Sequence, residues 1–123
     1  MSEEQDSRVT VRFGRPADAP ASAALLIEDG AAADDRPASA VVAHFRLPTT
    51  AHRPGCACCL PRGPVSLALG RLFLARARGE APLFDTVVAV TNSAAGRAAV
   101  RAALQADVIT QARFRLAPDQ LPE

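Results

Sequence analysis

The fold is decided by the stretch FDTVVAVTNSAAGRAAVRAALQA, residues 84–106. Its first part contains the β-branched run Thr86-Val87-Val88-Ala89-Val90, which predicts a buried strand. Asn92 and Ser93 come next, and residues of this kind cap the start of a helix, here predicted over residues 94–106. A buried strand that leads directly into a helix is typical of crossover units on a parallel sheet.

Comparable patterns lie on the N-terminal side of this stretch. Val9, Val11 and Phe13 alternate with polar residues, as in a half-buried strand. The complete set of predicted elements is a strand over residues 8–13, a helix over 19–28, a strand over 39–45, a helix over 65–78 with Gly79 as its C-terminal cap, the strand over 84–91 and the helix over 94–106. This order predicts an α/β fold: a small three-layer domain with about three mainly parallel strands and flanking helices.

The length of 123 residues suits one domain. We expect it to span residues 8–117, after a disordered N-terminus (1–7) and before a tail (118–123). Residues 47–64 form a long irregular segment that is rich in proline and holds every cysteine. Three parallel strands make a narrow sheet, so its edges need a partner, another copy, or the C-terminal segment from residue 107 onward.

Composition excludes several function classes. The net charge is +1, which argues against a nucleic-acid binder. All fourteen basic residues are arginine, so the chain has no lysine for a Schiff base or for a Walker A loop. The N-terminus is acidic and polar, unlike a secretory signal, and no apolar run is long enough to span a membrane. We therefore expect a cytoplasmic protein.

The sharpest motif is Gly55-Cys56-Ala57-Cys58-Cys59. Clustered thiols in a reducing compartment indicate metal or redox chemistry, and thiolates bind zinc tightly. Zinc takes four ligands, and His52 or His44 could supply the fourth. Two alternatives stay open: the cysteines are free thiols in a loop, and His44 is a strand-end histidine satisfied by the backbone. Cys56 and Cys59 also form a CxxC pair, but the usual aromatic and proline context of redox motifs is missing.

In this motif the chain resembles the CobW-like family of metal-chaperone GTPases, which carry GCxCC between their second strand and a helix. The resemblance covers residues 8 to about 117. Residues 8–14 are similar to the family's first strand and phosphate loop, 40–45 to its strand ending in Asn-Glu-Phe-Gly, 84–88 to the strand before its switch region, and 112–116 to the segment before its next strand. The resemblance implies metal binding and a role in metal homeostasis.

The departures from the family remove its nucleotide chemistry. In the place of the phosphate loop, Ala19 replaces a glycine, Pro20 the lysine and Ala21 the magnesium-binding hydroxyl. Because phosphoryl transfer depends on positioning and charge, we expect neither nucleotide binding nor GTPase activity. His44 stands where the family has a glutamate near the cysteines, which keeps a possible zinc ligand there.

The sequence therefore predicts a zinc-binding CobW-like protein without GTPase activity, which stores, senses or hands over metal. Its partner would be a second copy, a full-length CobW-like protein or a metal-dependent client. The alternative is a structural or regulatory interaction module whose cysteines are incidental.

Overall fold

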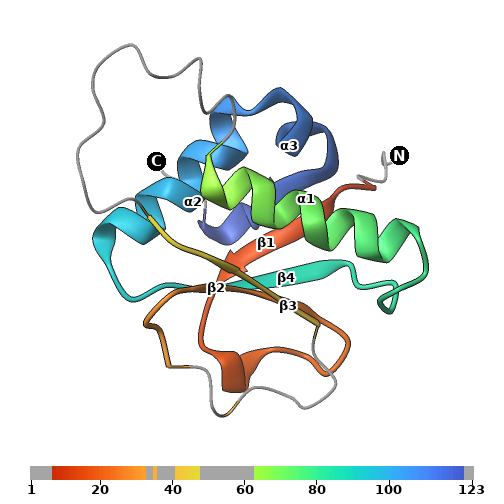
Figure 1. Ribbon diagram of the computed structural model, residues 1–123, viewed down its shortest axis with the longest axis horizontal. Helices are drawn as coiled ribbons and strands as arrows, with labels where there is room; N and C mark the ends of the chain where they lie inside the picture. Colours follow the sequence, from red (N-terminus) through yellow and green to blue (C-terminus); the bar gives the residue numbers. More distant parts are fainter. Residues whose placement is uncertain (1–6, 33–34, 36–40, 48–62, 121–123) are drawn as a thin grey trace.

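The computed structural model describes residues 7–32, 35, 41–47 and 63–120. Within these residues, five strands form one parallel sheet (Figure 1). Its order is β3-β2-β4-β1-β5, with β1 at Val9–Phe13, β2 at Ala24–Glu28, β3 at Val41–Phe45, β4 at Thr86–Val90 and β5 at Phe114–Leu116. The predicted α/β class and parallel sheet are confirmed, and the sheet has two more strands than the sequence predicted.

Two of the helices occur where the sequence places them. Helix α1 spans Pro64–Ala77 and ends before Gly79, whose positive φ of 77° closes the helix as the predicted cap. Helix α2 spans Ala94–Ala106, and its N-cap Ser93 accepts a hydrogen bond from the Gly96 amide at 2.9 Å. The predicted strand and helix within residues 84–106 are therefore confirmed as β4 and α2.

The sheet carries its helices on one face. The side chains of Val11, Leu26 and Ala89 belong to the large core, which also contains buried residues of α1 and α2. Both helices lie on the same side of the sheet (Figure 1). The opposite face carries a smaller cluster that includes Leu25, Ile27 and Val88, and the segment after β1 covers it with a 3₁₀ turn, η1 (Pro16–Asp18). The connection from β1 to β2 crosses the sheet in one direction, and the connection from β3 to β4 crosses it in the other. Because crossovers are right-handed, the two connections lie on opposite faces.

The predicted helix over residues 19–28 is wrong, because residues Ala24–Glu28 form strand β2. All five residues are buried, since β2 lies between β3 and β4 and packs on both faces. A strand buried on both faces has no alternating pattern, and its continuous apolar run is indistinguishable from that of a buried helix. Asp29 and Gly30, which follow the predicted helix in the sequence, therefore follow a strand.

The C-terminal segment completes the fold. A short helix, α3 (Val108–Arg113), leads into β5, which pairs with β1 and so covers that edge of the sheet. The turn η3 (Pro118–Gln120) follows, and the Gln120 side chain accepts from the Phe13 amide at 2.7 Å and donates to the Phe13 carbonyl at 3.1 Å. The sequence predicted that a partner, another copy or the C-terminal segment would cover the sheet edges. At β1 it is the C-terminal segment that does so. At the other end of the described sheet, β3 pairs only with β2.

Candidate functional site at the carboxyl edge of the sheet

The carboxyl ends of β1 to β4 meet at one edge of the sheet, because all four strands are parallel. Polar side chains follow the buried strands here: Glu28 and Asp29 from β2, His44 and Arg46 from β3, and Asn92 and Ser93 after β4. Ligands of open parallel sheets bind at this edge, so we take it as the candidate site.

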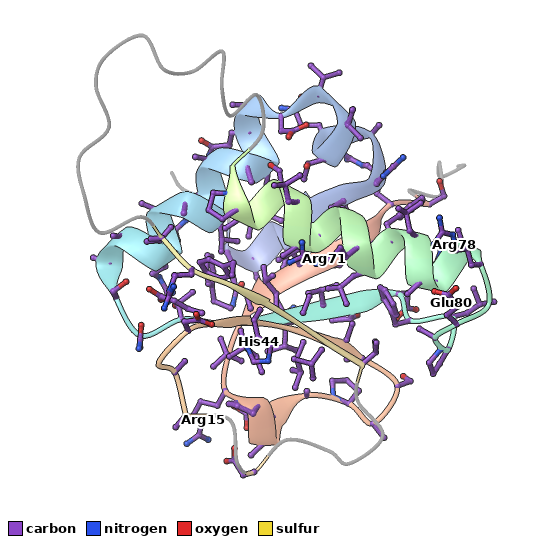
Figure 2. The ribbon with its side chains drawn as sticks, in the orientation of Figure 1. Arg15, His44, Arg71, Arg78 and Glu80 are labelled. Atoms are coloured by element: carbon purple, nitrogen blue, oxygen red, sulfur yellow. The ribbon has the colours of Figure 1, made fainter. Side chains whose placement is uncertain are left out.

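His44 lies exposed at the end of β3. It pairs in register with Ile27, whose side chain belongs to the helix-free face, so the imidazole lies on that face as well (Figure 2). Its Nδ1 is 4.0 Å from Asp29 Oδ1, and Arg46 Nε is 3.5 Å from the other oxygen of the same carboxylate. The Asp29 amide donates to the Phe45 carbonyl at 2.9 Å, which fixes the Asp29 backbone beside the end of β3.

The backbone of His44 is also engaged from the helical face. Arg71 of α1 donates through Nη2 to the His44 carbonyl at 3.3 Å (Figure 2). The hydrogen bond uses the main chain only, so the imidazole remains about 60% exposed. Among the described residues no backbone group hydrogen-bonds the His44 ring, contrary to the alternative in which backbone groups satisfy it. The ring's one ionic neighbour there is Asp29.

Glu28 is the buried carboxylate of this edge, only 7% exposed. Its Oε1 accepts from the Asn92 amide at 2.8 Å, and its Oε2 accepts from the Ser93 hydroxyl at 2.7 Å. Both donors belong to the connection between β4 and α2, and the positive end of the α2 dipole stabilises the negative charge. Glu28 thus ties β2 to the start of α2, and its oxygens are occupied by this structural role.

The segment that resembles a phosphate loop begins at Gly14 but leads into a 3₁₀ turn. Ala19, buried at the end of η1, has φ −74° and ψ 135°, while Pro20 and Ala21 are exposed. In this stretch the next regular element after η1 is strand β2. A phosphate loop presents its backbone amides at the start of a helix, and this connection offers no such helix.

Arg15 is held within the same connection. Its Nε donates to Asp18 Oδ2 at 3.2 Å, and this hydrogen bond, followed by charge attraction, raises the pKa of Arg15. The cation is therefore paired locally by Asp18 three residues on. It lies exposed on the helix-free side of the molecule (Figure 2).

The other predicted metal ligands, Cys56, Cys58, Cys59 and His52, lie outside the described residues. Within the described ranges, no three His, Cys, Asp or Glu side chains gather closely enough to hold a metal ion. His44 is accordingly the one predicted ligand whose surroundings are known. In the same ranges, no helix combines the length and apolar character needed to cross a membrane.

No family profile matches this chain, and no curated protein or solved structure matches it either. The resemblance to CobW-like proteins therefore rests on the sequence motifs of this chain alone.

Glu28 and Asp29 were not predicted as site residues, because Glu28 was placed in the predicted helix over residues 19–28 and Asp29 directly after it. A signal was present: the apolar run Ala23 to Ile27 is followed at once by Glu28, Asp29 and Gly30. An apolar run that ends in an acidic pair and a glycine is also the pattern of a buried parallel strand at a ligand-binding edge. Gly30 has φ +94° and turns the chain back at this edge.

Proposed function

We propose that this protein binds zinc through the thiolates of Cys56, Cys58 and Cys59, with His44 as the fourth ligand, and that it does not hydrolyse GTP. In this proposal it stores zinc or hands it to a metal-dependent client, or to a full-length CobW-like protein, in the reducing cytoplasm. The observation that carries the proposal is the exposed imidazole of His44 beside the Asp29 carboxylate, at the end of the strand that leads toward the cysteines.

The surroundings of His44 fit a zinc ligand. Metal-binding histidines commonly direct one ring nitrogen to a carboxylate, which orients the ring and raises its basicity, and coordinate with the other nitrogen. Here Nδ1 faces Asp29 Oδ1 at 4.0 Å, beyond hydrogen-bond distance, so in the proposed site the two side chains close by about 1 Å while Nε2 binds the metal. The Asp29 backbone is fixed by its amide bond to the Phe45 carbonyl, so only the two side chains need to move when the metal binds.

The absence of GTP hydrolysis is supported by the connection after β1. This connection contains a 3₁₀ turn in place of a phosphate-binding helix, and the chain contains no lysine. Pro20 in addition provides no amide donor. The groups that would position the phosphates and the lysine that would neutralise their charge are both missing, so we expect no detectable turnover of GTP.

The test is a zinc titration of the full chain against a chromophoric competitor. We expect one zinc per chain with a Kd well below about 1 µM, since structural zinc sites with thiolate ligands bind far more tightly than that. Replacing Cys58 with serine should weaken zinc binding by at least about 100-fold, because it removes a thiolate ligand. A wild-type Kd weaker than micromolar would refute the proposal.

Two histidine variants identify the fourth ligand. His44→Gln should weaken zinc binding strongly. His52→Gln makes the same change of side chain at the other histidine and should leave zinc binding unaltered. Asp29→Asn should weaken it by roughly tenfold, because the carboxylate orients the ring without binding the metal. If His52→Gln weakens binding and His44→Gln does not, His44 is not the ligand.

An apolar groove favours the second candidate function, an interaction module that pairs with a second copy of the chain. The groove has a volume of about 530 Å³ and lies between the start of α1 and the α2–α3 corner. Alanines of α2 line one wall, and Val108 and Ile109 at the start of α3 line it while remaining 76% and 45% exposed. The exposed side chains of Val108 and Ile109 and the groove lie on the same surface. A two-fold arrangement can therefore place these two side chains of each copy in the groove of the other.

This candidate predicts a concentration-dependent dimer in size-exclusion chromatography with light scattering. Val108→Glu should shift the population to monomer, since it would bury an unpaired charge at the interface. Leu83→Glu is the matched control, because Leu83 is equally exposed at 77% and lies outside the groove. A wild-type chain that stays monomeric at high concentration excludes this role for the groove.

A further inference from the structure

The outer edge of β3 presents backbone groups that no other described strand uses. Within the described sheet, β3 pairs only with β2. The Phe45 carbonyl faces β2, because it accepts from the Asp29 amide at 2.9 Å. Neighbouring residues of a strand direct their backbone groups to opposite sides, so the amides and carbonyls of Val42 and His44 point away from β2. These two residues are therefore placed to pair with a further strand.

Helix α1 packs over β3 and turns one flank toward this edge. Arg71 shows the direction, because its Nη2 donates to the outward carbonyl of His44 at 3.3 Å (Figure 2). Residues three or four positions apart share a helix flank, so Leu67, Leu74 and Arg78 follow the line of Arg71. Leu67 and Leu74 are 45% and 43% exposed, and both arginines are exposed as well. This flank of α1 and the outer edge of β3 form one surface, which we call the β3–α1 surface.

The charge of the β3–α1 surface indicates the chemistry of its partner. In the part of the chain that the structure describes, neither Arg71 nor Arg78 forms an ion pair, and Glu80, exposed two positions after Arg78, forms none there either. Arginine binds carboxylates through charge-assisted hydrogen bonds. A partner that brings carboxylates to this flank would therefore match both guanidinium groups.

A second copy of this chain fits the surface poorly. It would present its own β3, whose five residues include no carboxylate and which Arg46 follows. The helices α1, α2 and α3 contain no Asp or Glu either, so none of them would offset the two arginines. The charge therefore favours an acidic partner over self-association through this surface.

We propose that the β3–α1 surface binds an extended acidic segment of another protein, which adds to the sheet as a strand beside β3. The segment pairs its backbone with Val42 and His44, and every second side chain, about 7 Å apart, faces the leucines and arginines of α1. A carbonyl has two lone pairs, so the His44 carbonyl accepts from the segment and keeps its bond to Arg71. Only the backbone of His44 takes part, so the proposal stands independently of zinc binding.

The experiment titrates the full chain with two capped peptides, followed by amide shifts in ¹⁵N-correlated NMR spectra. In both peptides threonine alternates with a glutamate, a valine and a second glutamate, except that lysine replaces each glutamate in the second peptide. We expect the glutamate peptide to bind with a Kd of about 0.1–1 mM, because one short strand buries little surface. The lysine peptide should bind at least about tenfold more weakly. Equal binding of the two peptides, or no saturable binding of the glutamate peptide, would overturn the proposal.

Amide hydrogen exchange in the same samples identifies the mode of binding. At a peptide concentration about four times the Kd, the outward amides of Val42 and His44 should exchange about fivefold more slowly, because they exchange only in the free chain. The amides of Ala43 and Phe45 face β2 and should change little. Shifts confined to α1, without slower exchange in β3, would show docking on the helix alone and contradict the proposal. Protection of Val42 and His44 that rises with protein concentration in the absence of peptide would assign the edge to a second copy, which contradicts it as well.

Charge variants test the role of the arginines. Arg78→Gln should weaken binding of the glutamate peptide by about threefold to tenfold through loss of a charge-assisted bond. Arg15→Gln is the matched control, because it removes the same charge on the helix-free side, where Asp18 pairs with Arg15. Equal losses in these two variants would mean that net charge alone attracts the peptide, which contradicts a defined surface. The double variant Arg71→Glu, Arg78→Glu should prefer the lysine peptide, a reversal that an unfolded chain could not produce.

A backbone variant tests the strand pairing without changing any charge. Val42→Pro removes an amide that points away from β2, so the pairing of β3 with β2 is preserved, as for other prolines on edge strands. Binding of the glutamate peptide should weaken by at least about tenfold, because the added strand loses a backbone donor and meets the proline ring. Unchanged binding in a folded Val42→Pro chain would place the peptide away from the β3 edge and refute the proposal.

Discussion

Replacing Gly96 with alanine is expected to destabilise the protein by about 3 kcal/mol, although alanine is the better helix former. A Cβ at this position would lie 2.8 Å from Glu28 Oε2 and closer still to the other carboxylate atoms. The carboxylate cannot move aside freely, because the Asn92 amide and the Ser93 hydroxyl hold it in a buried position. The substitution therefore breaks the tie between β2 and α2.

A double-mutant cycle separates this cause from any general effect on the helix. Glu28→Ala alone should cost about 3 kcal/mol, because the two donors then lose a charged acceptor. In the Glu28→Ala background the clash is gone, so Gly96→Ala should be neutral or stabilise by about 0.5 kcal/mol. Unfolding in urea is followed by circular dichroism, because the chain has neither Trp nor Tyr for fluorescence. An equal cost of Gly96→Ala in both backgrounds would show that Glu28 is not the obstacle.

Phe114→Ala is expected to cost about 4 kcal/mol, the largest effect of any single truncation in the C-terminal segment. Phe114 is 1% exposed, and its ring meets Phe73 of α1 edge-to-face, with centroids 6.0 Å apart. Strand β5 is three residues long, so the phenylalanine side chain, rather than its few backbone bonds, holds the strand against β1.

Hydrogen exchange adds a local readout to the urea measurement. The Ala117 amide donates to the Val11 carbonyl at 2.8 Å, and Phe114→Ala should lower its protection more than that of amides in β4. Val108→Ala is the control, because Val108 is 76% exposed and its truncation should change stability by less than about 0.5 kcal/mol. A cost below about 1 kcal/mol for Phe114→Ala would show that β5 is held by its backbone pairing.

Much of the fold followed from local patterns. The alternation of Val9, Val11 and Phe13 predicted β1, because one face of that strand is more buried than the other. Ser93 and Gly79 predicted the ends of α2 and α1, because a capping hydroxyl and a left-handed glycine act within one turn of their own sequence. These signals depend only on near neighbours, so the sequence is sufficient to read them.

The candidate site was predictable only in part. His44 was found at the end of its strand, because an apolar run that stops at a polar residue marks a strand terminus. Its neighbour Asp29 was not found, since the two residues meet only when β2 and β3 pair in parallel. The four remaining predicted ligands lie outside the described residues, and their coordination of zinc stays a prediction.

By itself, then, the sequence determined the α/β class, the helices α1 and α2, and the position of His44, because periodicity and capping are local. Tertiary structure decided that residues 24–28 are a strand, that residues 114–116 complete the sheet, and that Glu28 joins β2 to α2. Each of these depends on burial from both sides or on pairing with a strand far away in the chain. Arg71 and the His44 carbonyl, 27 positions apart in the chain, likewise meet only once α1 packs over β3.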